Sequence, residues 1–177
     1  MAKIAFSKLG LTKDKLDEFQ TVEFNDQTIE VKQYLPIAEK AELISRVLNN
    51  SVDDDAGYYN NLKLDMWLAL EIVYAYSNIS FTEKQKSDPM KLYDLLSSNK
   101  LLNLIIGLVP ESEFYYLTKV THELATAIYT YRNSALGILD SIGRDYSNLN
   151  FDATEIQKKL ADPENLTLLK NIVEKLG

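Results

Sequence analysis

The sequence predicts a mainly α-helical protein: a helical bundle with an N-terminal β-hairpin and a long central helix. Apolar and polar residues alternate within residues 20–35, which is the period of a β-strand. From Pro36 onward, apolar residues recur every three or four positions, which is the period of an amphipathic helix. No linker rich in Pro, Gly or Ser divides the 177 residues. We therefore expect one domain over 1–177, with an arm and hairpin in 1–35 and the bundle in 36–177.

Two short pieces, separated by Gly10, precede the hairpin. Residues 3–7 are expected to form a short strand or an extended arm. Thr12 is placed to cap a short helix that continues through Phe19. If residues 4–6 pair with the hairpin, they supply a third strand.

The hairpin is predicted from two alternating segments, with Val22 and Phe24 on the first strand and Ile29 and Val31 on the second. Asn25-Asp26 between them tolerates the positive φ angles of a tight turn. Residues that pair directly across the two strands point to the same face of the hairpin. The apolar residues have even numbers on the first strand and odd numbers on the second. If they share a face, each even-numbered residue must pair with an odd-numbered one, so the two residue numbers of a pair sum to an odd value. A two-residue loop that pairs Val22 with Ile29 satisfies this condition, and so does a four-residue loop that pairs Phe24 with Ile29.

The helices that follow are predicted from periodicity and from their start signals. We expect helices over about 37–50, 59–77, 89–98 and 100–108, with a polar loop over 49–57. The buried stripe of the second helix is expected to contain Met66, Trp67, Leu70, Val73 and Tyr74. Thr82 to Gln85 has the spacing of a capping box, and Asp88-Pro89 places an N-cap acid before a first-turn proline.

The longest helix is expected to begin at Pro110 and to continue to about Tyr146, with a bend near Gly137 or Gly143. A helix of this length is either the spine of a small domain or a projection toward a partner. The C-terminal residues are predicted to form a helical hairpin, because Asp152 starts a second capping-box spacing and Asp162-Pro163 repeats the acid-proline start.

The search for catalytic chemistry finds no candidate. The chain has no Cys, and its one His, His122, has no metal-ligand spacing around it and is interpreted as a partly exposed structural residue. The acidic run at 53–57 lacks the ligand pattern of a calcium loop. No phosphate-binding glycine loop or nucleophile elbow occurs, and paired carboxylates such as Glu111 with Glu113 are taken to be ordinary surface acids. We therefore expect a non-enzymatic protein with no cofactor and no metal.

Charge and hydropathy restrict the classes of partner. The formal net charge is −7, and the 19 basic residues are spread along the chain, whereas a nucleic-acid surface needs clustered Lys and Arg. A protein that mimics DNA would need a purely anionic face. Basic residues alternate with acidic ones along this chain, so the sequence indicates no such face. The most apolar stretch, residues 101–109, is about half the ~20 residues that a membrane-spanning helix needs. We expect neither direct nucleic-acid binding nor membrane insertion.

Protein binding is the function class that remains. The chain has 11 Tyr, including the doublets Tyr58-Tyr59 and Tyr115-Tyr116, and adjacent residues of a helix cannot all face one core. Tyr is enriched at interfaces, although such rings also fill the edge of a core with the hydroxyl in water. The hairpin is the second candidate surface, because its free edges invite strand addition, although it could simply cap the helices. The candidate protein-binding residues are Val22, Phe24, Ile29, Val31, Tyr58, Tyr59, Tyr115 and Tyr116.

Several segments together suggest a context: IAFSKLGL (4–11), IEVKQYLP (29–36), FTEKQK (81–86), YRNS (131–134), DATEIQ (152–157) and ADPENL (161–166). They resemble a family of small proteins encoded by tailed phages and prophages of Gram-positive bacteria. The resemblance covers most of the chain and carries no catalytic motif. It implies a morphogenesis role, either as a virion component or as a tail-assembly chaperone, with other phage proteins or a second copy as the partner. It also implies a location in the host cytoplasm during infection or in the virion.

Two alternatives remain open at this stage. Small acidic helical phage proteins also act as inhibitors of host defence systems by binding and blocking another protein. An enzyme with an unrecognised site would be favoured by a pocket with convergent polar groups and perturbed carboxylates.

Overall fold

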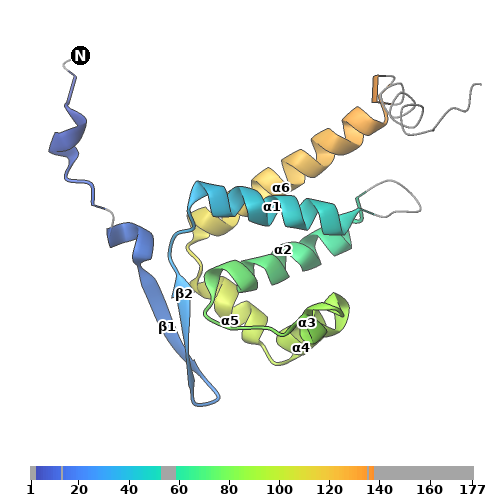
Figure 1. Ribbon diagram of the computed structural model, residues 1–177, viewed down its shortest axis with the longest axis horizontal. Helices are drawn as coiled ribbons and strands as arrows, with labels where there is room; N and C mark the ends of the chain where they lie inside the picture. Colours follow the sequence, from blue (N-terminus) through green and yellow to red (C-terminus); the bar gives the residue numbers. More distant parts are fainter. Residues whose placement is uncertain (1–2, 13, 53–58, 135, 138–177) are drawn as a thin grey trace, which may run out of the picture. The chain divides into compact units, whose positions relative to one another are not determined.

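The structure is a computed structural model that describes residues 3–12, 14–52, 59–134, 136 and 137. It confirms the predicted fold class, since a two-stranded antiparallel hairpin is followed by helices, including a long one (Figure 1). The chain divides into two units, residues 1–130 and 131–177, and each is described by itself. The expectation that 1–177 forms one domain stays a prediction.

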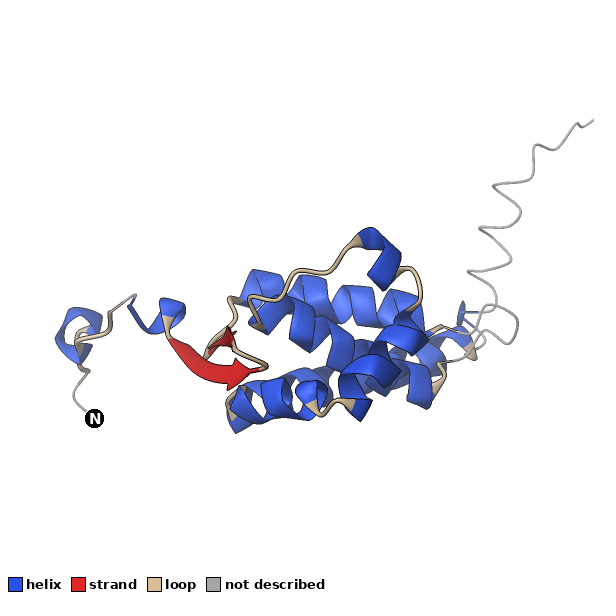
Figure 2. Ribbon diagram, turned by 90° about the horizontal axis from the view of Figure 1, so that it is seen from below, coloured by secondary structure: helices blue, strands red, loops and turns tan. Residues whose placement is uncertain are grey.

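The described elements follow one another in a simple order, with strands before the longer helices (Figure 2). Two 3-10 helices come first, and the strands and six α-helices follow. Their bounds are η1 Phe6–Leu9, η2 Asp14–Asp17, β1 Phe19–Phe24, β2 Gln27–Lys32, α1 Ile37–Ser51, α2 Asn61–Tyr76, α3 Glu83–Lys86, α4 Pro89–Ser98, α5 Leu101–Leu108 and α6 Glu111–Arg132.

The hairpin has the first of the two predicted registers. Val22 pairs with Ile29, and the loop consists of Asn25 and Asp26, whose φ angles are 49° and 60°. Positive φ at both central residues is the geometry of the tight turns that match the twist of paired strands. The predicted two-residue loop is therefore confirmed, and the four-residue alternative is wrong.

The start signals of the short helices are confirmed by their hydrogen bonds. The Gln85 amide donates to Thr82 Oγ1 (3.3 Å), and the Thr82 amide donates to Gln85 Oε1 (2.8 Å), which completes the capping box of α3. The Lys91 amide donates to Asp88 Oδ1 (3.2 Å) at the start of α4. Each signal and its hydrogen-bond partner lie within four residues, so a short stretch of sequence contains the whole interaction.

The core is built around α2, which packs against α1, α4 and α5. In the predicted stripe of α2, Met66, Leu70 and Val73 are buried and Trp67 and Tyr74 are partly buried, and apolar residues outside the stripe are buried as well. These additional buried residues are Leu64, Leu68, Ile72 and Tyr76. A helix that is apolar on most sides needs neighbours on most sides, and α2 has them (Figure 1).

The helix that begins after Pro110 ends earlier than its periodicity predicts. The periodicity predicts a helix to about Tyr146 with a bend near Gly137 or Gly143, whereas α6 ends at Arg132, a turn follows, and residues 136 and 137 are helical again. Residues 138–146 lie outside the described part of the chain. The Ser134 amide and hydroxyl both contact the Tyr131 carbonyl, at 3.0 and 2.6 Å, and the Gly137 amide donates to Ser134 Oγ. A Cβ at Gly137 would lie 2.0 Å from the Tyr131 oxygen, so this turn requires glycine there. The hydrogen bonds of Ser134 stabilise this local turn in place of a continuous helix.

The arm differs from its prediction as well. Residues 3–5 have no regular structure and are followed by η1, and Gly10 has a left-handed φ of 61°. The helix expected from Thr12 through Phe19 is only the short η2, and Phe19 belongs to β1. The predicted hairpin after Asp152, the acidic run at 53–57 and a bend at Gly143 lie outside the described residues.

Candidate functional site

The two outer edges of the hairpin are not equivalent. The Glu30 amide donates to Asn78 Oδ1 (3.1 Å), and the Asn78 amide donates to the Glu30 carbonyl (3.1 Å), so the segment after α2 covers the middle of the β2 edge. By the register, Phe19, Thr21 and Glu23 direct their backbone groups away from β2. Within the described residues, no segment pairs with that side of β1. The β1 outer edge, defined by these three residues, is therefore open to strand addition.

The candidate side chains of the hairpin have a packing role. Ile29 and Val31 are buried, and Val22 and Phe24 are partly buried against the helical core. Their faces point inward, so the hairpin caps the core as the simpler interpretation expected. Direct contact between these four side chains and a partner stays a prediction.

The tyrosine doublets divide into exposed and partly buried residues. Tyr115 and Tyr116 on α6 are 64% and 40% exposed, so this doublet presents two rings to solvent. Tyr59 is partly buried and lines a cavity beside α6. Tyr58 lies outside the described residues. The exposed doublet remains a candidate contact surface.

A groove between α1 and α6 is a feature that the sequence did not reveal. It has a volume of about 270 Å³, with Ile37, Ala41 and Leu48 on the α1 wall and Tyr116, Val120 and Leu124 on the α6 wall. We call it the α1/α6 groove. One sequence signal for this groove does exist. Leu117 and Ala125 form the buried apolar stripe of α6, and Val120 and Leu124 form a second apolar stripe beside it.

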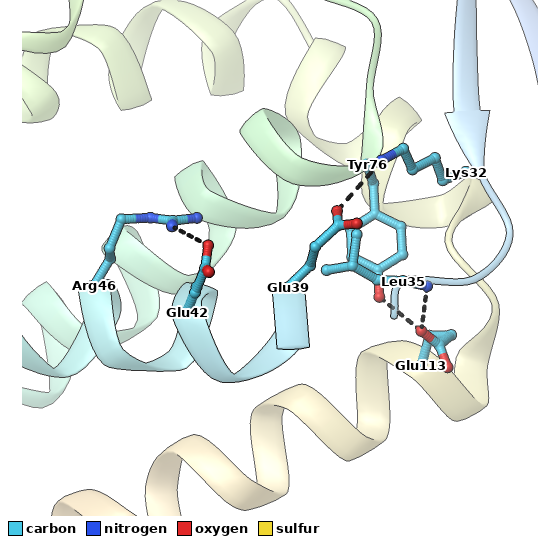
Figure 3. Close-up of polar contacts among 7 residues, drawn as sticks. All are labelled: Lys32, Leu35, Glu39, Glu42, Arg46, Tyr76 and Glu113. Atoms are coloured by element: carbon cyan, nitrogen blue, oxygen red, sulfur yellow. Dashed lines mark hydrogen bonds and ion pairs between the residues drawn. The ribbon is translucent and has the colours of Figure 1, made fainter. Parts of the chain in front are cut away.

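A buried polar cluster lies where α1, α2 and α6 meet, and sequence reasoning missed it. The Glu113 carboxylate accepts hydrogen bonds from Lys40 Nζ (2.7 Å), the Tyr76 hydroxyl (2.8 Å) and the Leu35 amide (3.2 Å), and Figure 3 shows the last two. Lys40 Nζ also lies 4.4 Å from the ring centroid of Tyr34. The sequence predicts an ordinary surface acid at Glu113, but this residue is 8% exposed, so that prediction is wrong. Burial, with the hydrogen bond to Glu113 and its negative charge, raises the pKa of Tyr76 far above its ordinary value.

This cluster is built for structure. Each of its polar groups is satisfied by another member, and the donors come from three different segments. Such an arrangement fixes the relative positions of the elements that supply it. It therefore sets the spacing of α1 and α6, which form the walls of the groove.

His122 has an orienting partner that the sequence could not supply. Its Nε2 lies 3.0 Å from Asp65 Oδ1, which joins α6 to α2, and the two side chains are 41% and 64% exposed. A cavity of about 270 Å³ beside it is lined by Tyr59, Asn61 and Thr126 among others. The Thr126 hydroxyl donates to the His122 carbonyl (2.8 Å), so it serves the helix and is not aimed at the imidazole. The pair is consistent with the structural role predicted for His122.

Two features are absent from the part of the chain that the structure describes. It contains no group of three or more His, Asp or Glu side chains that could hold a metal ion. None of its helices combines the length and the apolar character needed to cross a bilayer. Comparison of the chain with protein-family models, with curated proteins and with solved structures finds no match.

Proposed function

We propose that this protein is a non-enzymatic, protein-binding accessory protein of a tailed phage, acting as a virion component or as a tail-assembly chaperone. The observation that supports the binding role best is the open β1 outer edge. Backbone groups of Phe19, Thr21 and Glu23 have no strand across them among the described residues. An extended segment of a partner can add there through main-chain hydrogen bonds. The phage context comes from the resemblance of the sequence segments.

The side chains around this edge favour a chosen partner over random pairing. Glu23 carries a charge on the solvent face of β1, where the Thr28 hydroxyl donates to its carboxylate (2.6 Å). Charged residues on edge strands discourage indiscriminate aggregation. Exposed Tyr115 and Tyr116 offer a second contact region whose rings lose little conformational entropy on binding.

The partner should be captured from infected cells with the tagged full-length chain and identified by mass spectrometry. Binding of that partner is then measured for Thr21→Pro, which removes an outward amide from β1, and for Thr28→Pro, which does the same on β2. We expect binding at least about ten-fold weaker for Thr21→Pro and nearly unchanged for Thr28→Pro, since one lost hydrogen bond and a blocked edge cost about 1.4 kcal/mol or more.

Circular dichroism must show that both proline variants are folded. If Thr21→Pro is folded and binds as tightly as the unchanged chain, the hairpin is a cap and strand addition at β1 is wrong. Mass spectrometry of purified virions separates the two versions of the proposal. A virion component is found in the particle, whereas a chaperone co-purifies with a tail protein and is absent from the finished virion.

Plating efficiency tests the alternative of an inhibitor of host defence. Deletion of the gene should reduce particle yield on every host if the protein serves assembly. A deletion that lowers yield only on a host with an active defence system would replace the assembly role with inhibition.

A further inference from the structure

The arm, defined as residues 3–12, presents apolar side chains to solvent. Phe6 is 75% exposed, and Ile4, Leu9 and Leu11 are 73%, 53% and 69% exposed. Isolated exposed apolar residues are common, but four within one short segment mark a contact surface. The arm also contains two lysines, Lys3 and Lys8, and no acidic residue.

The α1/α6 groove has the complementary properties. Its walls are mainly apolar, and Ile37, Tyr116 and Leu124 are 65%, 40% and 42% exposed, so it is open to a ligand. Exposed Glu42 follows Ala41 on one wall, and exposed Glu123 precedes Leu124 on the other. Each faces a basic neighbour on its own helix at 3.9 Å, so the local contribution is modest.

The overall charge distribution adds to this complementarity. The chain has a formal charge of −7, and the two lysines of the arm contribute +2, which leaves −9 for the rest. A basic arm approaching an acidic body is attracted before any contact forms.

We propose that the arm of one copy inserts its apolar side chains into the α1/α6 groove of a second copy. The occupant is a second copy because the arm side chains are exposed and none of them lines the groove of its own copy. The arm and the groove are different surfaces, so the contact is heterologous and links copies into a ring, an open chain or a reciprocally exchanged dimer. This self-association goes beyond the proposed function and does not use the β1 outer edge.

Two charge-introducing variants of the full chain test the two halves of the contact. Phe6→Glu places a carboxylate on the arm, and Leu124→Glu places one on the groove wall. Both positions are exposed, so both variants should fold. Leu62→Glu on α2 is the matched control, because Leu62 is 81% exposed and belongs to neither surface. Sedimentation as a function of concentration should show self-association of the unchanged chain, dissociation constants about ten-fold or more higher for Phe6→Glu and Leu124→Glu, and no change for Leu62→Glu.

Mixing the two variants gives the decisive readout. The Phe6→Glu copy keeps an intact groove and the Leu124→Glu copy keeps an intact arm, so the mixture should form a heterodimer that neither forms alone. The proposal is overturned if the unchanged chain is monomeric, if either variant associates normally, or if the mixture stays monomeric. Thr21→Pro should leave self-association unchanged, so failure here is distinguishable from failure of strand addition at β1.

Discussion

Lys40 Nζ lies 2.7 Å from Oε1 of Glu113 in a place where the two side chains are only 7% and 11% exposed. The other carboxylate oxygen is occupied by the Tyr76 hydroxyl and the Leu35 amide. Taking these two charges out of water is costly, and the cost is offset only while both partners are present. Removal of one partner should therefore destabilise the protein by more than the intact pair stabilises it.

The first prediction concerns this pair. Glu113→Ala should lower the free energy of unfolding by about 3–5 kcal/mol, because Lys40 would remain buried without a counter-charge. Lys40→Met should also destabilise, and the double variant Lys40→Met/Glu113→Ala should lose less than the two single variants together. Urea denaturation of the full chain measures all of these values.

The exposed pair of Lys119 and Glu123, 3.9 Å apart on α6, provides the control for that cycle. Its coupling energy should be about 0.5 kcal/mol or less. Equal coupling energies for the buried and exposed pairs would contradict the structural role assigned to the cluster.

The second prediction uses the raised pKa of Tyr76. The folded state holds the Tyr76 proton above the pH at which the unfolded chain releases it, about pH 10. The contribution of the Tyr76 hydroxyl to the free energy of unfolding is therefore fully present below about pH 10. It is lost as the pH rises from there toward the pKa that Tyr76 has in the folded state. The difference in unfolding free energy between the unchanged chain and Tyr76→Phe should shrink by up to about 1.4 kcal/mol per pH unit above pH 10. If the difference in unfolding free energy between the two proteins stays constant from pH 8 to about pH 11.5, the raised pKa of Tyr76 does not contribute to stability and the prediction is wrong.

The third prediction concerns Lys100, whose φ of 63° places a non-glycine residue in the left-handed region between α4 and α5. Lys100→Gly should raise the free energy of unfolding by about 0.5–1 kcal/mol, because the steric cost of the left-handed conformation exceeds the entropy lost by glycine. The same substitution in a helix interior, Lys119→Gly, should lower it by about 1 kcal/mol. Thermal unfolding should therefore give shifts of opposite sign, and a decrease for Lys100→Gly would show that its side chain is needed.

The fourth prediction addresses the hairpin turn. Asp26 has a φ of 60°, a conformation that a β-branched residue adopts only with strain. Asp26→Val should destabilise by about 1–2 kcal/mol, and Asp26→Gly should be neutral or stabilising. Chemical denaturation distinguishes the two, and equal stability of both variants would argue against the tight turn.

Local signals made the hairpin and the short helices predictable. The Asn25-Asp26 turn, the Thr82 capping box and the Asp88 cap each act within a few residues, so one stretch of sequence contains the whole interaction. The end of α6 has a local signal in Ser134, but the apolar period that continues past it predicts a longer helix.

Contacts between distant segments could not be predicted in the same way. Asn78 covers the β2 edge from 48 residues away, and nothing near either residue announces the pairing. Lys40 stands on the apolar face of α1, between Ile37 and Ile44, which is a sign of a buried partner but does not say which acid supplies it. The α1/α6 groove depends on the spacing of two helices, and a single sequence does not encode that spacing in any short motif.

The position of Glu113 in the chain has a consequence for the order in which the protein acquires its structure. Glu113 is 78 residues after Leu35, 73 after Lys40 and 37 after Tyr76. On the ribosome, the hairpin, α1 and α2 are therefore synthesised well before the acid that pairs with Lys40 and accepts the hydrogen bond of the Tyr76 hydroxyl. A buried ammonium without its counter-charge is unfavourable, so the burial of Lys40 becomes favourable only when the first turn of α6 is present. The native surroundings of Lys40, in the first half of the chain, thus depend on a residue of the second half.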